Sequence, residues 1–148
     1  MRTGDLAPDF TLTDHTGTTF TLSSVLANGP VVLFFYPAAM SKGCTKESCY
    51  FRDLDSEFAA LGAQRVGISM DSVTKQARFN DAHQLGYPLL SDARGVVASR
   101  YGVKRPLDIL RVRRATFVIG TDQRILDVIT SELSMEVHAD RALAALRA

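Results

Sequence analysis

The chain has 148 residues, of which 46% are hydrophobic and 22% are charged, a size and composition typical of one globular domain. Its 17 lysine and arginine residues nearly balance its 16 aspartate and glutamate residues, so the formal net charge is only +1. This balance argues against binding to nucleic acid or to an anionic membrane. No apolar run approaches the ~20 residues that span a bilayer, and the N-terminus lacks the apolar core of a signal peptide. We therefore expect a soluble, cytoplasmic protein with a single domain over residues 1–148.

The N-terminal region predicts a β-hairpin followed by a buried strand. Residues 10–13 and 18–22 alternate apolar and small polar side chains around a glycine-containing turn at residues 14–17, the pattern of a hairpin. Residues 31–36 are apolar at every position, which is typical of a strand covered on both faces. We expect this strand to lie in the centre of a sheet.

A long amphipathic helix is predicted after the turn that follows this strand. Its apolar face repeats at steps of three, four and three residues: Phe51, Leu54, Phe58 and Leu61. Charged residues occupy the positions between them, and Gly62 supplies a helix stop. The helix is expected to begin near residues 41–44.

The rest of the chain continues to alternate between strands and helices. The predicted elements are a strand at 65–70, a helix at 72–84, a strand at 89–90, helical turns at 95–101, a hairpin of 115–120 with 125–130, and a helix at 136–146. Such a series predicts an α/β fold with a central mixed β-sheet flanked by helices.

Only two cysteines occur, Cys44 and Cys49, so one chain can build neither a multi-disulfide framework nor a four-thiolate zinc site. A cysteine pair in a reducing compartment is catalytic, redox-sensing or simply packed in the core. The histidines, His15, His83 and His138, are scattered along the sequence, and each is expected at the surface. We predict no metal site and no cofactor.

The position of Cys44 argues for reactivity, because a helix N-terminus offers free N–H groups and a positive dipole end that favour thiolate over thiol. The helical phase also turns its side chain toward the core. Cys49 follows five positions later, which in an ideal helix places the two Cα atoms about 8.7 Å apart, beyond the ~7 Å limit for a disulfide. Either the two cysteines never pair, or pairing requires the first helical turns to unwind.

The active-site segment of the chain resembles that of peroxiredoxins of the bacterioferritin comigratory protein, or peroxiredoxin Q, type. The matching residues are Tyr36-Pro37, Ser41, Gly43-Cys44-Thr45-Lys46-Glu47-Ser48-Cys49 and Phe51-Arg52-Asp53. The resemblance continues through residues 4–10, 67–72, 88–92 and 114–119. It implies a thioredoxin-like fold.

The resemblance also implies roles for individual residues. Pro37, Ser41 and Cys44 match the Pro-x-x-x-Thr/Ser-x-x-Cys motif of the peroxide pocket, and Arg114 matches an arginine of the same site. Cys44 would be the peroxidatic cysteine, oxidised to a sulfenic acid, and Cys49 occupies the resolving position that would give an intrachain disulfide. The implied enzyme is an atypical 2-Cys peroxidase that thioredoxin or a similar dithiol re-reduces. The resemblance does not determine the oligomeric state, so both a monomer and a homodimer are expected as possibilities.

Physical reasoning leaves alternatives open at several of these residues. Ser41 could donate its hydroxyl to the peroxide, cap the helix or do both, and Pro37 could simply end the strand. Arg114 lies beside Arg111 and Arg113, and only the resemblance selects it over a surface ion pair. Two further charged residues match the family but are expected as exposed helical charges: Glu47 and Arg52.

The favoured function is thus a thiol peroxidase that reduces hydrogen peroxide and organic hydroperoxides. A thioredoxin-like disulfide reductase is the alternative enzyme, although that chemistry normally uses Cys-x-x-Cys and this chain has four residues between Cys44 and Cys49. A non-enzymatic redox sensor, in which oxidation unfolds the start of the helix, is the third possibility.

Overall fold

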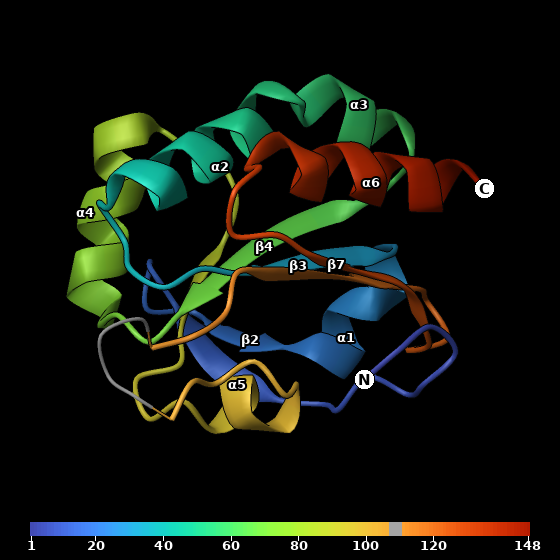
Figure 1. Cartoon of the computed structure of the whole chain (residues 1–148), viewed down its shortest axis with the longest axis horizontal. Helices are drawn as coiled ribbons and strands as arrows, with labels where there is room; N and C mark the ends of the chain where they lie inside the picture. Colours follow the sequence, from blue (N-terminus) through green and yellow to red (C-terminus); the bar gives the residue numbers. More distant parts are fainter. Residues whose placement is uncertain (107–110) are drawn as a thin grey trace.

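The computed structural model describes residues 1–106 and 111–148, and these residues form a mixed sheet of seven strands (Figure 1). The strands are β1 (Thr11–Asp14), β2 (Thr19–Thr21), β3 (Val31–Phe35), β4 (Gln64–Ser69), β5 (Leu89–Ser91), β6 (Ala115–Ile119) and β7 (Ile125–Thr130). Their order across the sheet is β2-β1-β5-β4-β3-β6-β7. Strands β3, β4 and β5 are parallel, whereas the other pairs are antiparallel.

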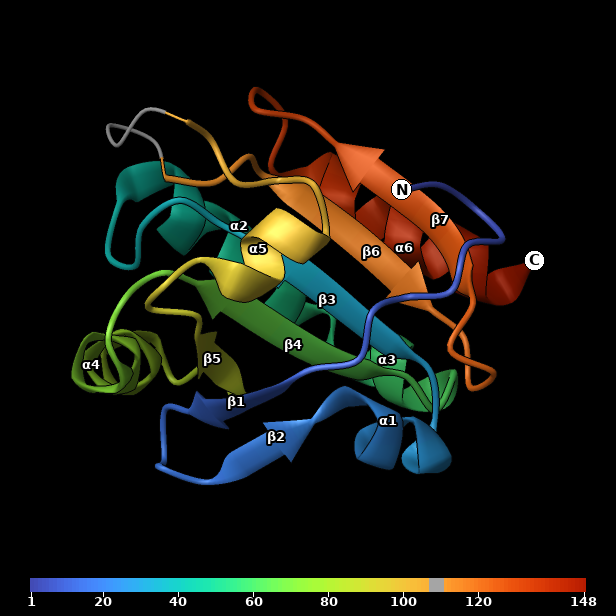
Figure 2. The same ribbon diagram turned by 90° about the horizontal axis from the view of Figure 1, so that it is seen from below.

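Helices cover both faces of this sheet. They are α1 (Leu22–Val25), the 3-10 turn η1 (Leu26–Asn28), α2 (Lys42–Asp53), α3 (Asp55–Ala60), α4 (Val73–His83), α5 (Val96–Arg100) and α6 (Glu136–Arg147). Figures 1 and 2 show α2, α3, α4 and α6 on one face, with α1 and α5 on the other. The prediction of a mixed sheet flanked by helices, with an N-terminal hairpin, is confirmed.

Among the described residues, none of the helices is both long and apolar enough to cross a membrane.

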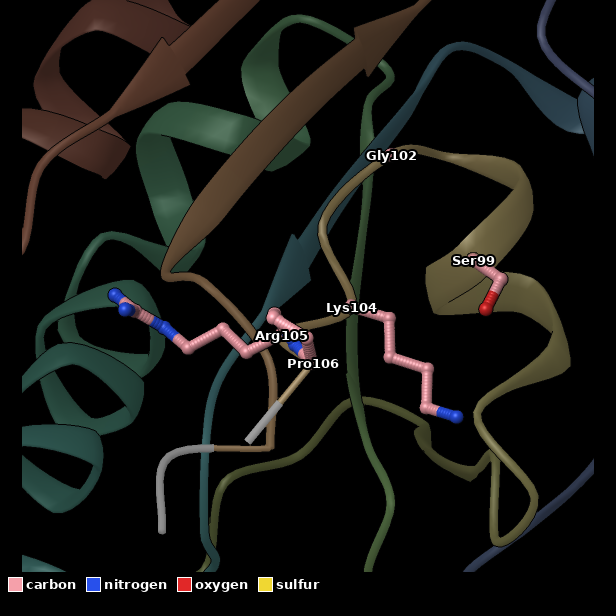
Figure 3. A pocket seen from close by; sticks show the side chains of 5 residues that line it. All are labelled: Ser99, Gly102, Lys104, Arg105 and Pro106. Carbon is pink, nitrogen blue, oxygen red and sulfur yellow. The ribbon is translucent and has the colours of Figure 1, made fainter. Parts of the chain in front are cut away.

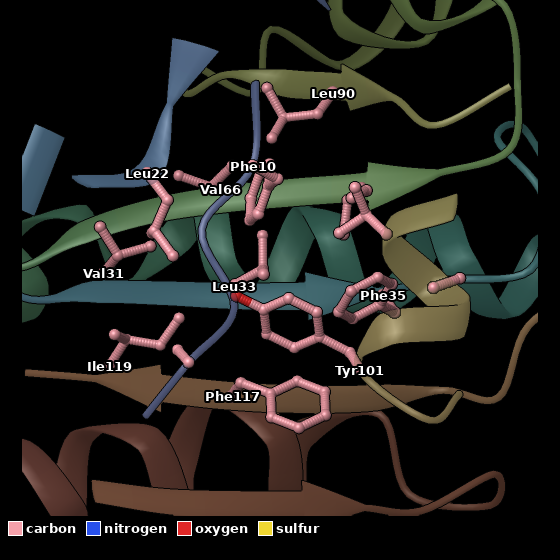
Figure 4. Packing of buried hydrophobic residues seen from close by; sticks show 14 of the residues in the cluster. Phe10, Leu22, Val31, Leu33, Phe35, Val66, Leu90, Tyr101, Phe117 and Ile119 are labelled. Atoms are coloured by element: carbon pink, nitrogen blue, oxygen red, sulfur yellow. The ribbon is translucent and has the colours of Figure 1, made fainter. Parts of the chain in front are cut away.

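Strand β3 lies inside the sheet, as its apolar sequence predicts, and its neighbours are β4 and β6. Because side chains alternate along a strand, β3 supplies Leu33 and Phe35 to the core on the α5 side, shown in Figure 4. It supplies Val32 and Phe34 to the core beneath α2 and α6. All five residues of β3 are buried, so this strand anchors both layers.

The long helix predicted up to Leu61 is divided in two, which corrects the sequence-based expectation. Helix α2 ends at Asp53, and α3 begins at Asp55. The break coincides with a contact from β4: the Arg65 guanidinium donates to the carbonyl of Phe51 at 2.8 Å and pairs with Asp55. Arg65, which is distant from this helix in the sequence, thus binds a carbonyl at the end of α2. No local sequence pattern reveals such a contact.

Candidate active site

Cys44 is the third residue of α2, at the end that follows the loop after β3. Its side chain is fully buried, as the helical phase predicts. The N–H groups of the first turn have no partners within the helix, and they present positive partial charge to the sulfur. Gly43 leaves space for a cationic neighbour, because a Cβ there would lie 3.3 Å from Nη2 of Arg114. The site is therefore built to stabilise negative charge on sulfur.

Arg114 provides the full positive charge beside this thiol. Strand β6 pairs with β3 so that Ala115 lies opposite Phe35, which places the preceding residue, Arg114, next to the loop that leads to Cys44. The buried guanidinium places Nη2 3.2 Å from Sγ of Cys44. Its Nη1 donates to Oε1 of Glu47 at 2.9 Å. The sheet register thus determines which side chain reaches the sulfur.

The three neighbouring arginines have different surroundings. Arg111 pairs with the buried carboxylate of Asp71 at 3.0 Å, while Arg113 is exposed. Of the three, the structure brings only Arg114 to the thiol. Asp71 also accepts a hydrogen bond of 2.7 Å from the Ala39 N–H. Sequence reasoning missed this carboxylate, which fixes the loop before Cys44.

Glu47 is completely buried, so the expectation of an exposed helical charge is wrong. It lies one helical turn after Cys44 and faces inward, where α6 packs against α2. Burial raises the pKa of Glu47 to about 8, although the Arg114 guanidinium opposes the shift. The three-residue spacing from Cys44 is the sequence feature that could have revealed the buried position.

His138 on α6 extends this buried polar cluster, and its expected surface position is also wrong. Its Nδ1 lies 2.8 Å from Oγ1 of Thr116, and its Nε2 lies 2.9 Å from the carbonyl oxygen of Ser131. A carbonyl can only accept, so Nε2 carries the proton and Nδ1 accepts from the threonine. Burial lowers the pKa of His138, which favours the neutral ring. Nε2 is 3.6 Å from Oε2 of Glu47.

The loop between β3 and α2 contains the other two residues of the predicted peroxide pocket. Pro37 is buried and lies two residues after the end of β3. Ser41 is the N-cap residue of α2, yet its hydroxyl makes no capping bond and instead donates to the carbonyl of Ala38 at 2.8 Å. Of the two alternatives for Ser41, side-chain capping is therefore absent in this structure. Met40, just before it, has a φ of 69°, which is uncommon for a residue with a side chain.

The structure does not bring the two cysteines together. Cys49 lies further along the same uninterrupted helix and is partly exposed, and both thiols are free. A hydroxyl from outside the helix holds this region: Tyr87 donates to the carbonyl of Ser48 at 2.7 Å. A disulfide would therefore require α2 to unwind locally.

A mixed sheet with a buried thiol at the start of the helix after a central strand defines a thiol-dependent redox protein. Its charge stabilisation comes from the protein itself, through a guanidinium and helical N–H groups. Within residues 1–106 and 111–148, no group of three histidine, cysteine, aspartate or glutamate side chains is arranged to hold a metal ion. The arrangement suits nucleophilic attack by sulfur.

Similar proteins of known family show which kind of thiol-dependent redox protein this is. The sequence matches the AhpC/TSA family over residues 3–128. A Mycobacterium tuberculosis protein assigned to the peroxiredoxins is 61% identical over 150 residues, which cover 100% of this chain and 97% of that protein. The chloroplastic peroxiredoxin Q of Suaeda salsa is 36% identical over 140 residues, covering 95% of this chain and 65% of that protein.

Solved structures agree with the sequence matches. The crystal structure of peroxidoxin BcpB from Mycobacterium tuberculosis has a TM-score of 0.95 and 60% identity, covering 99% of this chain and 97% of that one. Peroxiredoxin Q of Xanthomonas campestris has a TM-score of 0.85 and 29% identity, covering 93% and 89%. The chain belongs to the AhpC/TSA family of peroxiredoxins, and the predicted thioredoxin-like fold is confirmed. Membership in this family makes it a thiol peroxidase.

Proposed function

We propose that the chain, acting as one domain, reduces hydrogen peroxide and organic hydroperoxides with Cys44 as the peroxidatic cysteine. The observation that carries the proposal is the 3.2 Å distance between Nη2 of Arg114 and Sγ of the buried Cys44. A guanidinium so placed stabilises charge on the attacking sulfur and on the oxygen that leaves. Structures of the Xanthomonas campestris bacterioferritin comigratory protein concern alkyl peroxide reduction, which supports including organic hydroperoxides.

In the first step, the Cys44 thiolate attacks the nearer peroxide oxygen. A sulfur–oxygen bond forms while the oxygen–oxygen bond breaks, and the departing oxygen takes a proton to leave as water or an alcohol. Cys44 is then a sulfenic acid, oxidised by two electrons. Arg114 remains protonated throughout, since a guanidinium does not lose its proton in proteins. Its role is to stabilise charge, and the leaving oxygen takes its proton from the peroxide or from water.

Pro37 and Ser41 prepare the pocket for this step. Pro37 has no N–H, so it can exclude water from the buried thiol without offering a competing donor. The Ser41 hydroxyl, which donates to Ala38 in the free protein, can turn toward a bound peroxide and donate to it. A hydroxyl is well suited to this exchange because it rotates freely between acceptors.

The first test measures peroxide consumption by the reduced protein in stopped-flow experiments. Cys44→Ser should abolish consumption, and Arg114→Gln should slow it by about 10²–10³-fold, the usual cost of removing a donor that stabilises developing charge. Arg94→Gln is the control, since Arg94 is exposed and has no part in the site. Peroxide consumption at the wild-type rate by Cys44→Ser would reject the proposal.

We further propose that Cys49 resolves the sulfenic acid. The Cys49 thiol attacks Sγ of Cys44, a disulfide forms and water leaves. Because both residues lie on α2, the helix must unwind between them before the sulfurs can meet. Thioredoxin, or a similar dithiol, would then reduce the disulfide and allow α2 to re-form.

Mass spectrometry after one equivalent of peroxide tests this resolving step. The wild-type peptide that contains both cysteines should lose two hydrogens, whereas Cys49→Ser should retain a sulfenic acid that dimedone traps. The first consumption of peroxide should stay fast in Cys49→Ser, since Cys49 acts only afterwards. A persistent sulfenic acid in the wild-type protein, or an interchain dimer, would contradict the assignment.

The reductant is tested by following turnover with thioredoxin and its reductase, and separately with glutathione and glutaredoxin. We expect steady turnover with thioredoxin. Turnover with glutaredoxin alone would show that thioredoxin is the wrong partner while leaving the peroxide step intact.

A further inference from the structure

A polar cavity lies beside Arg114 and is not used by the reaction described above. Its volume is about 350 Å³. The residues that line it are Arg105, Arg113, Arg114, Thr130, Ser131 and Glu132. The Arg114 guanidinium is turned toward Cys44 and Glu47, so Arg105 and Arg113 supply the positive charge that faces the carboxylate of Glu132, and the lining carries one excess positive charge. Such a cavity suits an anionic group better than a neutral one.

Glu132 occupies part of this cavity. Its Oε1 accepts from Nη2 of Arg105 at 3.0 Å and from the backbone N–H of Arg114 at 3.0 Å. The glutamate is exposed, so water can solvate its side chain once another carboxylate accepts these two hydrogen bonds in its place. In the free protein it serves as the counter-ion that a bound carboxylate would replace.

The arginines retain donors for such a ligand. Nε of Arg105 is buried and has no hydrogen-bond partner among the described residues. A buried N–H without an acceptor is costly, and a carboxylate bound to Arg105 could accept from it. Figure 3 shows the Arg105 side chain extending away from α5, while the neighbouring Lys104 points the opposite way. Arg113 is exposed and forms no ion pair with another described residue.

Arg114 connects this cavity to the thiol. The residue lines the cavity, and its N–H holds Glu132, while its Nη2 lies 3.2 Å from Sγ of Cys44. Arg114 therefore extends from the cavity to the sulfur of Cys44. A substrate with a hydroperoxide at one end and an anionic group at the other could therefore contact both.

We propose that the cavity is a carboxylate subsite and that the enzyme prefers hydroperoxides that carry a carboxylate. The inference rests on the proposed peroxidase function and specifies its substrate class. The substrate carboxylate displaces Glu132 from Arg105 and from the N–H of Arg114. It is then held by that N–H and by the guanidinium groups of Arg105 and Arg113, while the hydroperoxide reaches Cys44. A neutral hydroperoxide makes no such exchange, so it gains nothing from the two arginines.

The test compares two hydroperoxides of nearly the same shape, 4-(2-hydroperoxypropan-2-yl)benzoate and its uncharged carboxamide. The measured quantity is the ratio of their second-order rate constants with the reduced protein. We expect the carboxylate to react about tenfold faster or more, the range given by charge-assisted hydrogen bonds. Added salt should lower this ratio, because it screens exposed charges.

Variants at the cavity should change this ratio in opposite directions. Arg105→Gln and Arg113→Gln should each lower it toward one, whereas Glu132→Gln should raise it by removing the competing charge. The control Arg147→Gln removes one positive charge near the end of α6 and should keep the wild-type ratio. A general loss of folded protein would slow both hydroperoxides alike, so it cannot raise the ratio in one variant and lower it in the others.

A wild-type ratio near one, or a ratio that Arg105→Gln and Arg113→Gln leave unchanged, would overturn the subsite. Hydrogen peroxide distinguishes this result from failure of the peroxidase proposal. If the protein consumes hydrogen peroxide but the ratio is one, only the subsite is wrong. If it consumes no peroxide at all, both proposals are wrong.

Discussion

The two faces of the central sheet are both covered by helices, but they bury different chemistry. On the α5 side, the aromatic rings of Phe35, Tyr101 and Phe117 pack edge to face or tilted, with centroids 5.1–5.7 Å apart. On the α2 and α6 side, an apolar core is joined by buried polar groups, among them Glu47 and His138. The first face therefore contributes mainly stability, whereas the second combines stability with reactivity.

Strand β6 shows how closely the two environments adjoin. Phe117 faces the aromatic core, whereas its neighbour Thr116 faces His138 on α6. The period of two along a strand separates them, since successive side chains point to opposite sides of the sheet. A polar cluster can therefore be built on one face without interrupting the apolar packing of the other. Four substitutions test how independent the faces are.

The largest expected effect is on the apolar face. Phe117→Ala should lower the free energy of unfolding by about 3–5 kcal/mol, the usual cost of removing a buried phenylalanine ring. Chemical denaturation measures this loss. The rate of peroxide consumption per folded molecule should stay near the wild-type value. A tenfold fall in that rate would show that the two faces are coupled.

Glu47 should make stability depend on pH on the other face. Its pKa is raised by burial from 4.5 to about 8, so between these values the unfolded chain loses a proton that the folded protein keeps. The free energy of unfolding should therefore fall as pH rises from 4.5 to 8, by up to about 1.4 kcal/mol per pH unit. Denaturation of Glu47→Gln should lack this slope, and the half-exposed Glu136→Gln should retain it. An unchanged slope in Glu47→Gln would contradict the assignment.

The hydrogen bond between Thr116 and His138 should contribute less to the free energy of unfolding than the two features above. Thr116→Val removes the hydroxyl that lies 2.8 Å from Nδ1 of the buried histidine and leaves that nitrogen without a donor. We expect a loss of about 1–3 kcal/mol in the free energy of unfolding. Thr13→Val, at an exposed position of β1, is the matched control and should change little. Equal effects of the two substitutions would show that burial of the pair is unimportant.

The smallest expected effect is at a helix cap away from the thiol. Ser72 caps α4 by accepting from the N–H of Lys75 at 3.2 Å, as the sequence predicts. Ser72→Ala should lower the free energy of unfolding by about 1 kcal/mol without changing peroxide consumption. Ser72→Asp, which can still cap the helix, is the control. A loss of peroxidase activity in Ser72→Ala alone would extend the functional region to α4.

Local patterns were sufficient to predict most of the secondary structure. The continuous apolar run of β3 predicted a central strand, and Ser72 marked the start of α4. The helix break after Asp53 could not be predicted, because Arg65 comes from another strand. The exposure of Glu47 and His138 was predicted wrongly for a similar reason. A charged or titratable side chain is usually exposed, and only the packing of α6 on α2 buries this pair.

The sequence by itself determined the apolar periodicities, the thiol at a helix start and the separation of the two cysteines on that helix. These features depend on spacings of a few residues, which backbone geometry converts directly into position. Only the tertiary structure decided that Arg114 contacts Cys44, because the register of β6 on β3 places it there. The same long-range packing buries Glu47 and His138 and forms the cavity with three arginines. Those contacts join residues from distant parts of the chain. They form only when the strands pair in register and the helices pack on the sheet.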